Sequence, residues 1–197
     1  MQPTDTVRGP IYYGPDVAVF FSDAFLRTHC FRLVKAPVAT PEQKHWKQVI
    51  GHRKQVMLEG VDLFRDFMVV HERDAGITKL RVIDWKLSRD YHIDFPEASY
   101  SASGGANLVF DTRTYRIGYT SFLTPGSVID YALDTGKRTL KKEQPVLGDY
   151  DRTRYVTEAI KVKAPDGTRV PVSLVYRKAD AAGPRPLLLY GYGSYGI

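Results

Sequence analysis

VIDWKL at residues 82–87 and VIDYAL at residues 128–133 are nearly the same six-residue stretch, and they lie 46 residues apart. The sequence around them also repeats. The segments that begin at Val17, Phe67 and Tyr115 each contain a strand, a short turn, a second strand, a longer turn and a third strand. Because a repeat of ~40–50 residues with about four short antiparallel strands is typical of a β-propeller blade, the sequence predicts a propeller.

Alternation of apolar and polar residues predicts strands throughout the first two thirds of the chain, and a sustained helical period is missing there. The predicted strands cover residues 17–23, 30–37, 66–73, 78–85, 91–95, 115–122 and 127–133. A blade cannot bury both faces of its sheet alone, and three blades are too few to close a ring of ~4–8. We therefore expect part of a larger propeller, with an irregular β-sandwich as the alternative.

The repeat ends near Glu143, and the remaining sequence has another character. Residues 144–155 are polar and rich in turn residues, and residues 155–178 alternate as two strands joined at an Asp-Gly pair, which favours a tight hairpin. The uninterrupted apolar run LLLY at 187–190 predicts a strand covered on both faces, as in an α/β sheet. A second domain is therefore predicted to begin near residue 150 and to be cut off at residue 197.

Composition and charge favour an ordinary soluble protein. The net charge is +6, but the basic runs KLSRD and TGKRTLKKEQ contain acids as well, so neither a nucleic-acid nor a membrane partner is expected. The single cysteine, Cys30, excludes an intramolecular disulfide and is expected to be a small buried hydrophobe. No signal peptide or membrane-spanning run is recognisable, so a cytoplasmic location is expected.

Few residues have the spacing of a catalytic, cofactor or metal site. Gly191, Gly193 and Gly196 spell GxGxxG, but the helix and acidic residue of a dinucleotide fingerprint would lie past Ile197. Ser194 lacks the first glycine of a GxSxG nucleophile elbow. The histidines, at 29, 45, 52, 71 and 92, show no metal-ligand spacing, so neither a metal nor a cofactor is predicted.

Two other features have alternative interpretations. Asp84 and Asp130 recur with the repeat, so we expect blade-turn residues and not an acid–base pair. The glycine-rich YGYGSYG loop at 190–196 follows an apolar run, and glycines let a backbone approach a ligand closely. A tyrosine hydroxyl on such a loop can donate a hydrogen bond to a developing oxyanion, whereas aromatic packing at a domain interface explains the loop equally well.

Several long stretches resemble the prolyl oligopeptidase family, and most closely its oligopeptidase B members. YVTEAIKVKAPDGTRVPVSLVYRK with PLLLYGYGSYG resembles the start of the peptidase domain, while VMLEGVDLFRDFMVVHERDAGITKLRV and YTSFLTPGSVIDYALDTGKRTLKKEQPVLGDYDRTRY resemble the last propeller blades. The resemblance implies a mainly β fold with about three blades of a seven-bladed propeller, followed by the first strands of an α/β-hydrolase domain. It divides the chain into a propeller part at 1–145, a linker at 146–154 and a truncated peptidase part at 155–197.

The resemblance also implies a function. Members of the family are serine peptidases that cut short peptides, and oligopeptidase B members cut after Arg or Lys. In the matching loop, Tyr192 corresponds to the tyrosine that completes the oxyanion hole, and Tyr195 to an aromatic residue of the substrate pocket. The Ser, Asp and His of the catalytic triad would lie beyond Ile197, so the chain is expected to be inactive without the remainder of the peptidase. A noncatalytic propeller that binds a peptide or protein is the alternative.

Overall fold

The computed structural model describes residues 7–13, 17–22, 32–180 and 183–192. The described strands form three four-stranded sheets and one two-stranded hairpin. In each four-stranded sheet the strands lie in chain order, and all their pairings are antiparallel, as expected for propeller blades. Among the described residues, no helix is both long and apolar enough to cross a membrane.

Each sheet is named here as a blade, in chain order. Blade 1 consists of β1 (Val7–Tyr13), β2 (Val17–Ser22), β3 (Arg32–Pro37) and β4 (Lys47–Ile50). Blade 2 consists of β5 (Val56–Leu63), β6 (Phe67–Asp74), β7 (Ile77–Asp84) and β8 (Arg89–His92). Blade 3 consists of β9 (Tyr100–Gly104), β10 (Thr114–Ser121), β11 (Ser127–Ala132) and β12 (Arg138–Glu143). The hairpin consists of β13 (Tyr155–Lys163) and β14 (Arg169–Arg177), and the short helices are η1 (Gln43–His45), η2 (Arg152–Arg154) and η3 (Lys178–Asp180).

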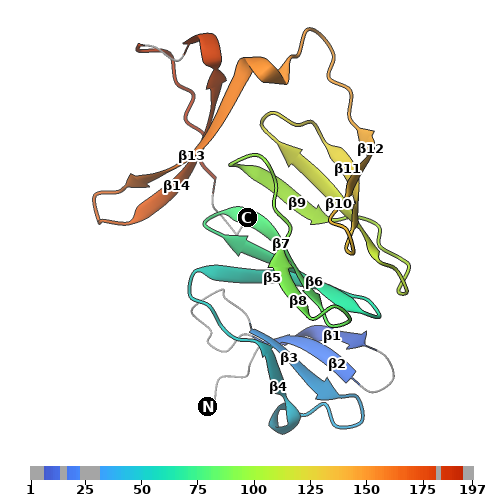
Figure 1. The fold of residues 1–197 in the computed structure, drawn as a ribbon. Helices are drawn as coiled ribbons and strands as arrows, with labels where there is room; N and C mark the ends of the chain where they lie inside the picture. The colour runs from blue at the N-terminus through green and yellow to red at the C-terminus, as the bar shows by residue number, and fades with distance from the viewer. Residues whose placement is uncertain (1–6, 14–16, 23–31, 181–182, 193–197) are drawn as a thin grey trace.

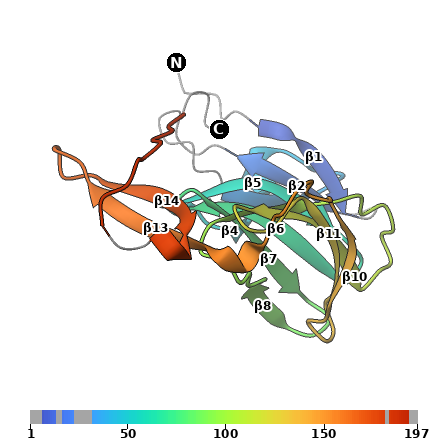
Figure 2. The same ribbon diagram turned by 90° about the horizontal axis from the view of Figure 1, so that it is seen from above.

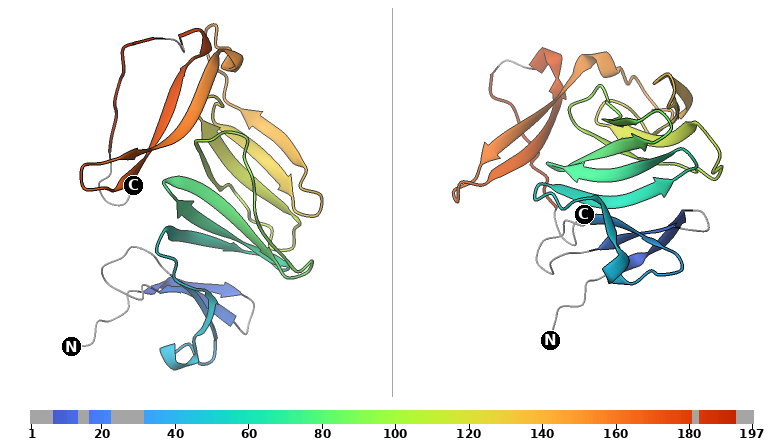
Figure 3. Two further views of the ribbon diagram at one scale, coloured as in Figure 1. Left: turned by 60° about the vertical axis from the view of Figure 1, so that its left-hand side comes forward. Right: turned by 60° about the horizontal axis from the view of Figure 1, so that its bottom comes forward.

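The three blades are stacked one after another, and the hairpin stands to one side of them. Figure 1 shows blade 2 between blades 1 and 3, and the left view of Figure 3 shows the three sheets fanning out. Figure 2 shows β13 and β14 projecting from the stack. The partial β-propeller predicted from the repeat is confirmed, and the β-sandwich alternative is wrong because the sheets are successive blades and not two facing layers.

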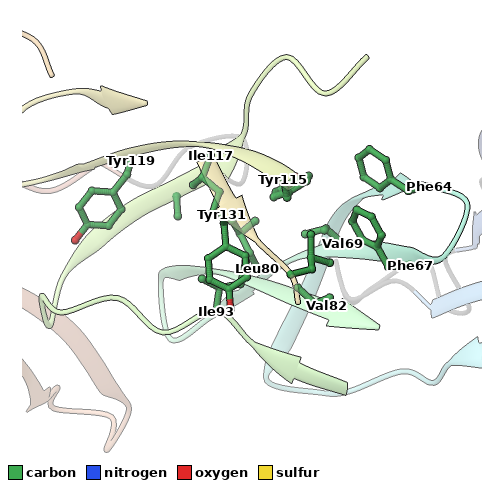
Figure 4. Close-up of a cluster of buried hydrophobic side chains, with 12 residues drawn as sticks. Phe64, Phe67, Val69, Leu80, Val82, Ile93, Tyr115, Ile117, Tyr119 and Tyr131 are labelled. Carbon is green, nitrogen blue, oxygen red and sulfur yellow. The ribbon is translucent and has the colours of Figure 1, made fainter. Parts of the chain in front are cut away.

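Apolar side chains fill the junctions between blades. The larger cluster lies between blades 2 and 3 and includes Phe67, Leu80, Tyr115 and Ile117, each with 0% of its surface exposed (Figure 4). Strands β6 and β7 supply one wall of this cluster, and β10 and β11 supply the other. A second cluster joins blade 1 to blade 2 through residues that include Leu33. Both faces of blade 2 are therefore buried, which is why β6 begins with four buried residues in a row.

The repeat in the structure has a slightly different offset from the 46 residues that separate the two VID triplets. Met68 pairs with Ile83 on the face of blade 2 toward blade 1, and Tyr115 pairs with Tyr131 on the face of blade 3 toward blade 2. Equivalent positions are thus 47 residues apart in β6 and β10 and 48 apart in β7 and β11. The two VID triplets, 46 residues apart, are therefore displaced by two positions, so they lie on the same face at different heights.

The second and third strands of each blade were predicted, whereas the first strands were not. The pattern of β5 is interrupted because its pairing with β6 shifts register between Leu58 and Gly60. Strand β9, YSASG, is short and made mostly of small residues that have low strand propensity. Of the outer strands, β8 was predicted at 91–95 and lies at Arg89–His92, whereas β4 was not predicted. The strands that the sequence reveals are thus those rich in apolar residues, and the strands with an interrupted or small-residue pattern are missed.

The hairpin prediction is confirmed, but the strand predicted at 187–190 is wrong. Strands β13 and β14 pair over their full lengths, and Gly167 has a φ of +88° in the connecting turn, a conformation that favours glycine. Residues 184–192 have no regular structure, and Leu188 is 92% exposed. An apolar run forms a covered strand only beside other strands, and the described residues offer none to it.

The junction between blades 2 and 3 predicts a large cost for removing a core side chain. We expect Leu80→Ala to lower the free energy of unfolding by about 2–5 kcal/mol, because it leaves a cavity in a fully buried cluster. Leu108→Ala is the matched control, since Leu108 is 93% exposed and should change stability by less than about 0.5 kcal/mol. Urea unfolding followed by circular dichroism measures both, and equal effects would contradict this assignment of the core.

Candidate functional site

Of the two predicted site residues, the structure describes one. Tyr192 is the last residue of the irregular segment 184–192 and is 61% exposed. Tyr195 lies outside the described residues, as do Cys30 and His29. The predicted roles of both tyrosines therefore stay predictions, and what the structure provides is the framework that carries this segment.

The hairpin that precedes this segment is held against the propeller by polar contacts. The Ser99 hydroxyl, just before β9, donates a hydrogen bond of 2.7 Å to the Ser173 hydroxyl on β14. The Tyr150 hydroxyl donates one of 2.5 Å to the backbone oxygen of Leu123, and its ring lies 6.0 Å from the ring of Tyr155 at the start of β13. The hairpin is thus attached to blade 3 at two places, through Tyr150 in the connection and through Ser173 on β14.

Segment 184–192 runs beside the hairpin, and it begins with a cation–π contact. The Arg185 guanidinium lies 4.5 Å from the centroid of the Tyr176 ring on β14. After this contact the apolar side chains are open to solvent, since Leu187 and Leu189 are 78% and 79% exposed. The segment therefore carries Tyr192 on a surface that is apolar and uncovered among the described residues.

The junction of blades 2 and 3 contains a polar cluster that joins Asp62, His71 and Tyr115. The Tyr115 hydroxyl donates to the Oδ2 atom of Asp62, and the His71 Nε2 atom lies 3.0 Å from both oxygens. A proton on Nε2 would be shared between the carboxylate and the phenol oxygen, which closes a ring of hydrogen bonds. A Cβ atom at Gly104 would lie 2.6 Å from Asp62 Oδ2, so the cluster also requires glycine there.

The electrostatics of this cluster favour a structural role. Burial and then the negative charge of Asp62 raise the pKa of the Tyr115 phenol. Burial alone would raise the pKa of Asp62, but hydrogen bonds from His71 and Tyr115 outweigh it and hold that pKa below 3.8. A neutral phenol that donates to a stable carboxylate holds two blades together. It is a poor acid or base near neutral pH, so the cluster does not replace a catalytic site.

A second polar cluster closes the same junction around Asp84. The Asp84 side chain is 0% exposed, lies 2.6 Å from Nη2 of Arg113 and accepts a hydrogen bond of 3.0 Å from the backbone nitrogen of Leu87. Arg113 also contacts Asp134 at 2.6 Å, and Arg89 donates to the backbone oxygen of Leu133 at 2.7 Å. A carboxylate of blade 2 is thus neutralised by an arginine of blade 3.

Asp84 and Asp130 were both expected to be blade-turn residues, and this is correct only for Asp84. Asp84 caps the turn after β7, as expected of a blade-turn residue. Asp130 instead lies within β11, where it pairs with Arg116 of β10 at 2.7 Å. The two-residue displacement of the repeat explains the difference, because Asp130 occupies the height of Val82 and not that of Asp84.

A third polar contact lies at the other end of β10. The Tyr119 hydroxyl donates to Glu97 in the connection between the blades, and Thr124 and Ser121 donate to the same carboxylate at 2.5 and 3.1 Å. Burial raises the pKa of Tyr119, whereas the hydroxyl donors lower the pKa of Glu97 in spite of its burial. These three contacts are made by Arg113, which directly precedes β10, and by Tyr115 and Tyr119 on one face of β10.

The histidines that the structure describes take part in ion pairs and hydrogen bonds. His71 and His92 lie in strands β6 and β8, and His92 Nε2 lies 3.0 Å from the Glu72 carboxylate, which is also paired with Arg53. Burial would raise the pKa of Glu72, but these partners lower it. Within the described ranges, no group of three or more His, Cys, Asp or Glu side chains is arranged to hold a metal ion.

The comparisons with known proteins agree with the blade architecture. The family model for the prolyl oligopeptidase N-terminal β-propeller domain matches residues 16–144. This chain belongs to the prolyl oligopeptidase family. Dipeptidyl aminopeptidase BI of Pseudoxanthomonas mexicana is 44% identical over 84% of the chain, and Protease 2 of Moraxella lacunata is 31% identical over 100% of it.

Two solved structures of family members have the same fold as this chain. Oligopeptidase B from Trypanosoma brucei, in a closed form with covalently bound antipain, aligns over 97% of the chain with a TM-score of 0.82 and 28% identity. Oligopeptidase B from Leishmania major aligns over 97% with a TM-score of 0.82 and 27% identity. The chain spans 28% of each of those chains and 23% and 28% of the two sequence relatives, so it corresponds to about a quarter of a family member.

Removing the Tyr115 hydroxyl tests the first polar cluster. We expect Tyr115→Phe to lower the free energy of unfolding by about 1–3 kcal/mol, because the buried side of Asp62 loses a hydrogen-bond donor. Tyr192→Phe makes the same chemical change at an exposed position and should have almost no effect. Urea unfolding provides the comparison, and an unchanged stability of Tyr115→Phe would refute the proposed link between the blades.

The pKa of Asp84 predicts a specific acid sensitivity. Burial would raise this pKa, but Arg113, the backbone nitrogen of Leu87 and Arg89 hold it below 3.8. Ionised Asp84 therefore contributes stability that is fully present above pH 3.8 and is lost as the pH falls through the lower folded pKa. We expect Asp84→Asn to be less stable at pH 7 and to lose less stability on acidification below pH 3.8.

The control for this acid sensitivity is Asp111→Asn. It removes the same charge from an exposed pair with Arg65, in which Asp111 is 62% exposed. Thermal unfolding between pH 2.5 and 7 should give the wild-type pH dependence for this variant. An Asp84→Asn variant whose curve runs parallel to the wild type would contradict the role of the Asp84 carboxylate.

Proposed function

We propose that the chain is an internal part of a serine oligopeptidase that hydrolyses short peptides after Arg or Lys. The main support is the match of residues 16–144 to the family propeller, together with a relative named Protease 2 that is similar along the whole chain. The coverage supports the oligopeptidase B branch, because the two oligopeptidase B structures align over 97% of the chain, whereas the prolyl endopeptidases, at similar identity, match over 84% of it.

In this proposal the chain contributes the last part of the propeller at 1–145, a linker at 146–154 and the beginning of an α/β-hydrolase domain at 155–197. The paired strands β13 and β14 support the last assignment, because they directly follow the propeller match. On the hairpin face that carries Ile160, Val162 and Val170, these side chains are 38%, 47% and 43% exposed. An apolar face of this kind is stable when further strands or helices cover it.

Within such a domain, Tyr192 would donate its hydroxyl to the oxyanion of the acyl-transfer reaction, and Tyr195 would line the pocket for the substrate side chain. The nucleophile, acid and base would come from chain beyond residue 197. The isolated 197-residue chain would therefore bind no oxyanion productively and would hydrolyse no peptide. The propeller would restrict access to short peptides.

The first test uses the chain itself. The purified 197-residue chain should release no chromophore from a peptide with Arg before the scissile bond. Turnover that a serine-directed inhibitor abolishes would contradict the proposed inactivity. Supplying the remaining part of the peptidase as a separate polypeptide tests whether the two parts restore activity together.

The second test uses the full-length polypeptide that contains this sequence. It should hydrolyse substrates with Arg or Lys before the scissile bond, and Tyr192→Phe should lower kcat about 10²- to 10³-fold with a smaller change in KM, as for loss of one oxyanion donor. Tyr176→Phe is the control, because the Tyr176 hydroxyl contacts Glu158 within the hairpin. Cleavage only after Pro, or release of N-terminal dipeptides, would show that the proposed specificity is wrong.

A further inference from the structure

Blade 1 carries most of the excess positive charge of the chain. Residues 32–54 contain six Lys or Arg and one acid, Glu42, whereas the whole chain has a net charge of +6. The sequence does not show this concentration as one basic run, because the basic residues are spread along 23 positions. The fold brings them together on β3, η1, β4 and the loop that follows.

The pairing of β3 with β4 places two like charges side by side. Lys35 and Lys47 are directly opposite each other in the antiparallel register, and both are exposed. Like charges in this arrangement destabilise a sheet. Neither lysine, nor Lys44 in the adjacent η1, forms an ion pair with any residue that the structure describes. Only solvent or a bound partner can therefore reduce the repulsion between Lys35 and Lys47.

The other two outer strands differ in this respect. On blade 2, Asp90 of β8 accepts two hydrogen bonds from Arg81, at 2.7 and 2.6 Å. On blade 3, Lys141 of β12 lies 4.0 Å from Asp130, and Glu143 of β12 pairs with Arg152 at 2.9 Å. Lys142 of β12 also lacks an ion pair with a described residue, but it lies opposite Val128. Among the three described outer strands, only β4 therefore places a lysine directly opposite a second lysine.

The position of β4 in its sheet explains what such charges can recognise. It is the last strand in the order β1-β2-β3-β4, so one edge of its backbone pairs with no other strand of that sheet. An extended peptide can add to a free edge through main-chain hydrogen bonds. Lysines on an edge discourage neutral and basic strands, but they favour an acidic one. Val49, which is 37% exposed, offers an apolar contact between the charges.

We infer that β4 is a docking edge for an extended acidic segment of another protein, which pairs with residues Lys47–Ile50 while its carboxylates face Lys35, Lys44 and Lys47. A nucleic-acid phosphate backbone would satisfy the lysines but could not continue the ladder of backbone hydrogen bonds. The free edge therefore favours a polypeptide. This site is separate from the proposed peptidase function, which it neither requires nor explains.

Fluorescence anisotropy with the full 197-residue chain tests the inference. The probe is a fluorescein-labelled eight-residue peptide of alternating Glu and Val, and a Lys-Val peptide of equal length is its control. We expect the acidic peptide to bind and the basic one not to bind, with affinity falling as salt rises, because the contacts are exposed ion pairs. The double variant Lys35→Glu and Lys47→Glu should weaken binding about tenfold or more at low salt.

Two controls separate this docking edge from general attraction to a basic protein. Lys142→Glu changes the charge equally on the outer strand β12 and should leave binding unchanged. A Glu-Val peptide with alternate backbone nitrogens methylated should bind at least several-fold more weakly, because it cannot complete the ladder. Circular dichroism confirms that each variant is folded.

Three results would overturn the inference. The first is equal binding of the methylated and unmethylated peptides, which would show that charge alone explains the binding and that β4 does not pair with the peptide backbone. The second is an equal loss of affinity in Lys142→Glu. The third is binding of a single-stranded oligonucleotide in preference to the acidic peptide, which would assign the lysines to phosphate.

Discussion

A four-stranded antiparallel sheet has two faces, and in a blade both of them must be covered by something other than the blade itself. Blade 2 shows the consequence. Its strand β6 is buried on one side by Leu33 and Ile50 of blade 1 and on the other by Tyr115 and Ile117 of blade 3. The stability of each blade therefore depends on its junctions with the neighbouring blades, as in other repeat proteins.

Apolar contact alone does not determine how two blades are aligned, because burial is favourable in many registers. The polar contacts at β10 determine this alignment, because they require particular partners. Tyr115 and Tyr119 lie on one face of the strand and Arg113 directly precedes it, and each contacts a carboxylate contributed by blade 2 or by the connection that leaves it. A slip of blade 3 would leave buried carboxylates and phenols without partners, which costs more than the apolar contacts it could regain. These contacts thus specify one alignment of the two sheets.

The sequence predicts those parts of the fold whose signal is local. Strands β7, β10 and β11 alternate, β6 begins with an apolar run, and the Asp-Gly turn of the hairpin is a short-range signal, so all were identified. The contact of Asp62 with Tyr115 joins residues 53 positions apart, and nothing in either neighbourhood indicates the other. The same is true of Lys35 and Lys47, whose opposition depends on the register of two strands. The offset of the repeat also depends on strand pairing, because the VID triplets are 46 residues apart, whereas the pairs Met68–Ile83 and Tyr115–Tyr131 give offsets of 47 and 48.

The segment at 187–192 was predicted from the same kind of local signal, and its exposure has a physical explanation. LLLY is apolar enough to be a covered strand, but a strand requires hydrogen-bonding neighbours in addition to an apolar sequence. The hairpin beside it has an apolar face of its own, and the two are joined by the contact of Arg185 with Tyr176, without forming one sheet. Two adjacent apolar surfaces that do not cover each other both require a third element. Under the proposed function that element is the rest of a hydrolase sheet, and its arrival would order the backbone that carries Tyr192.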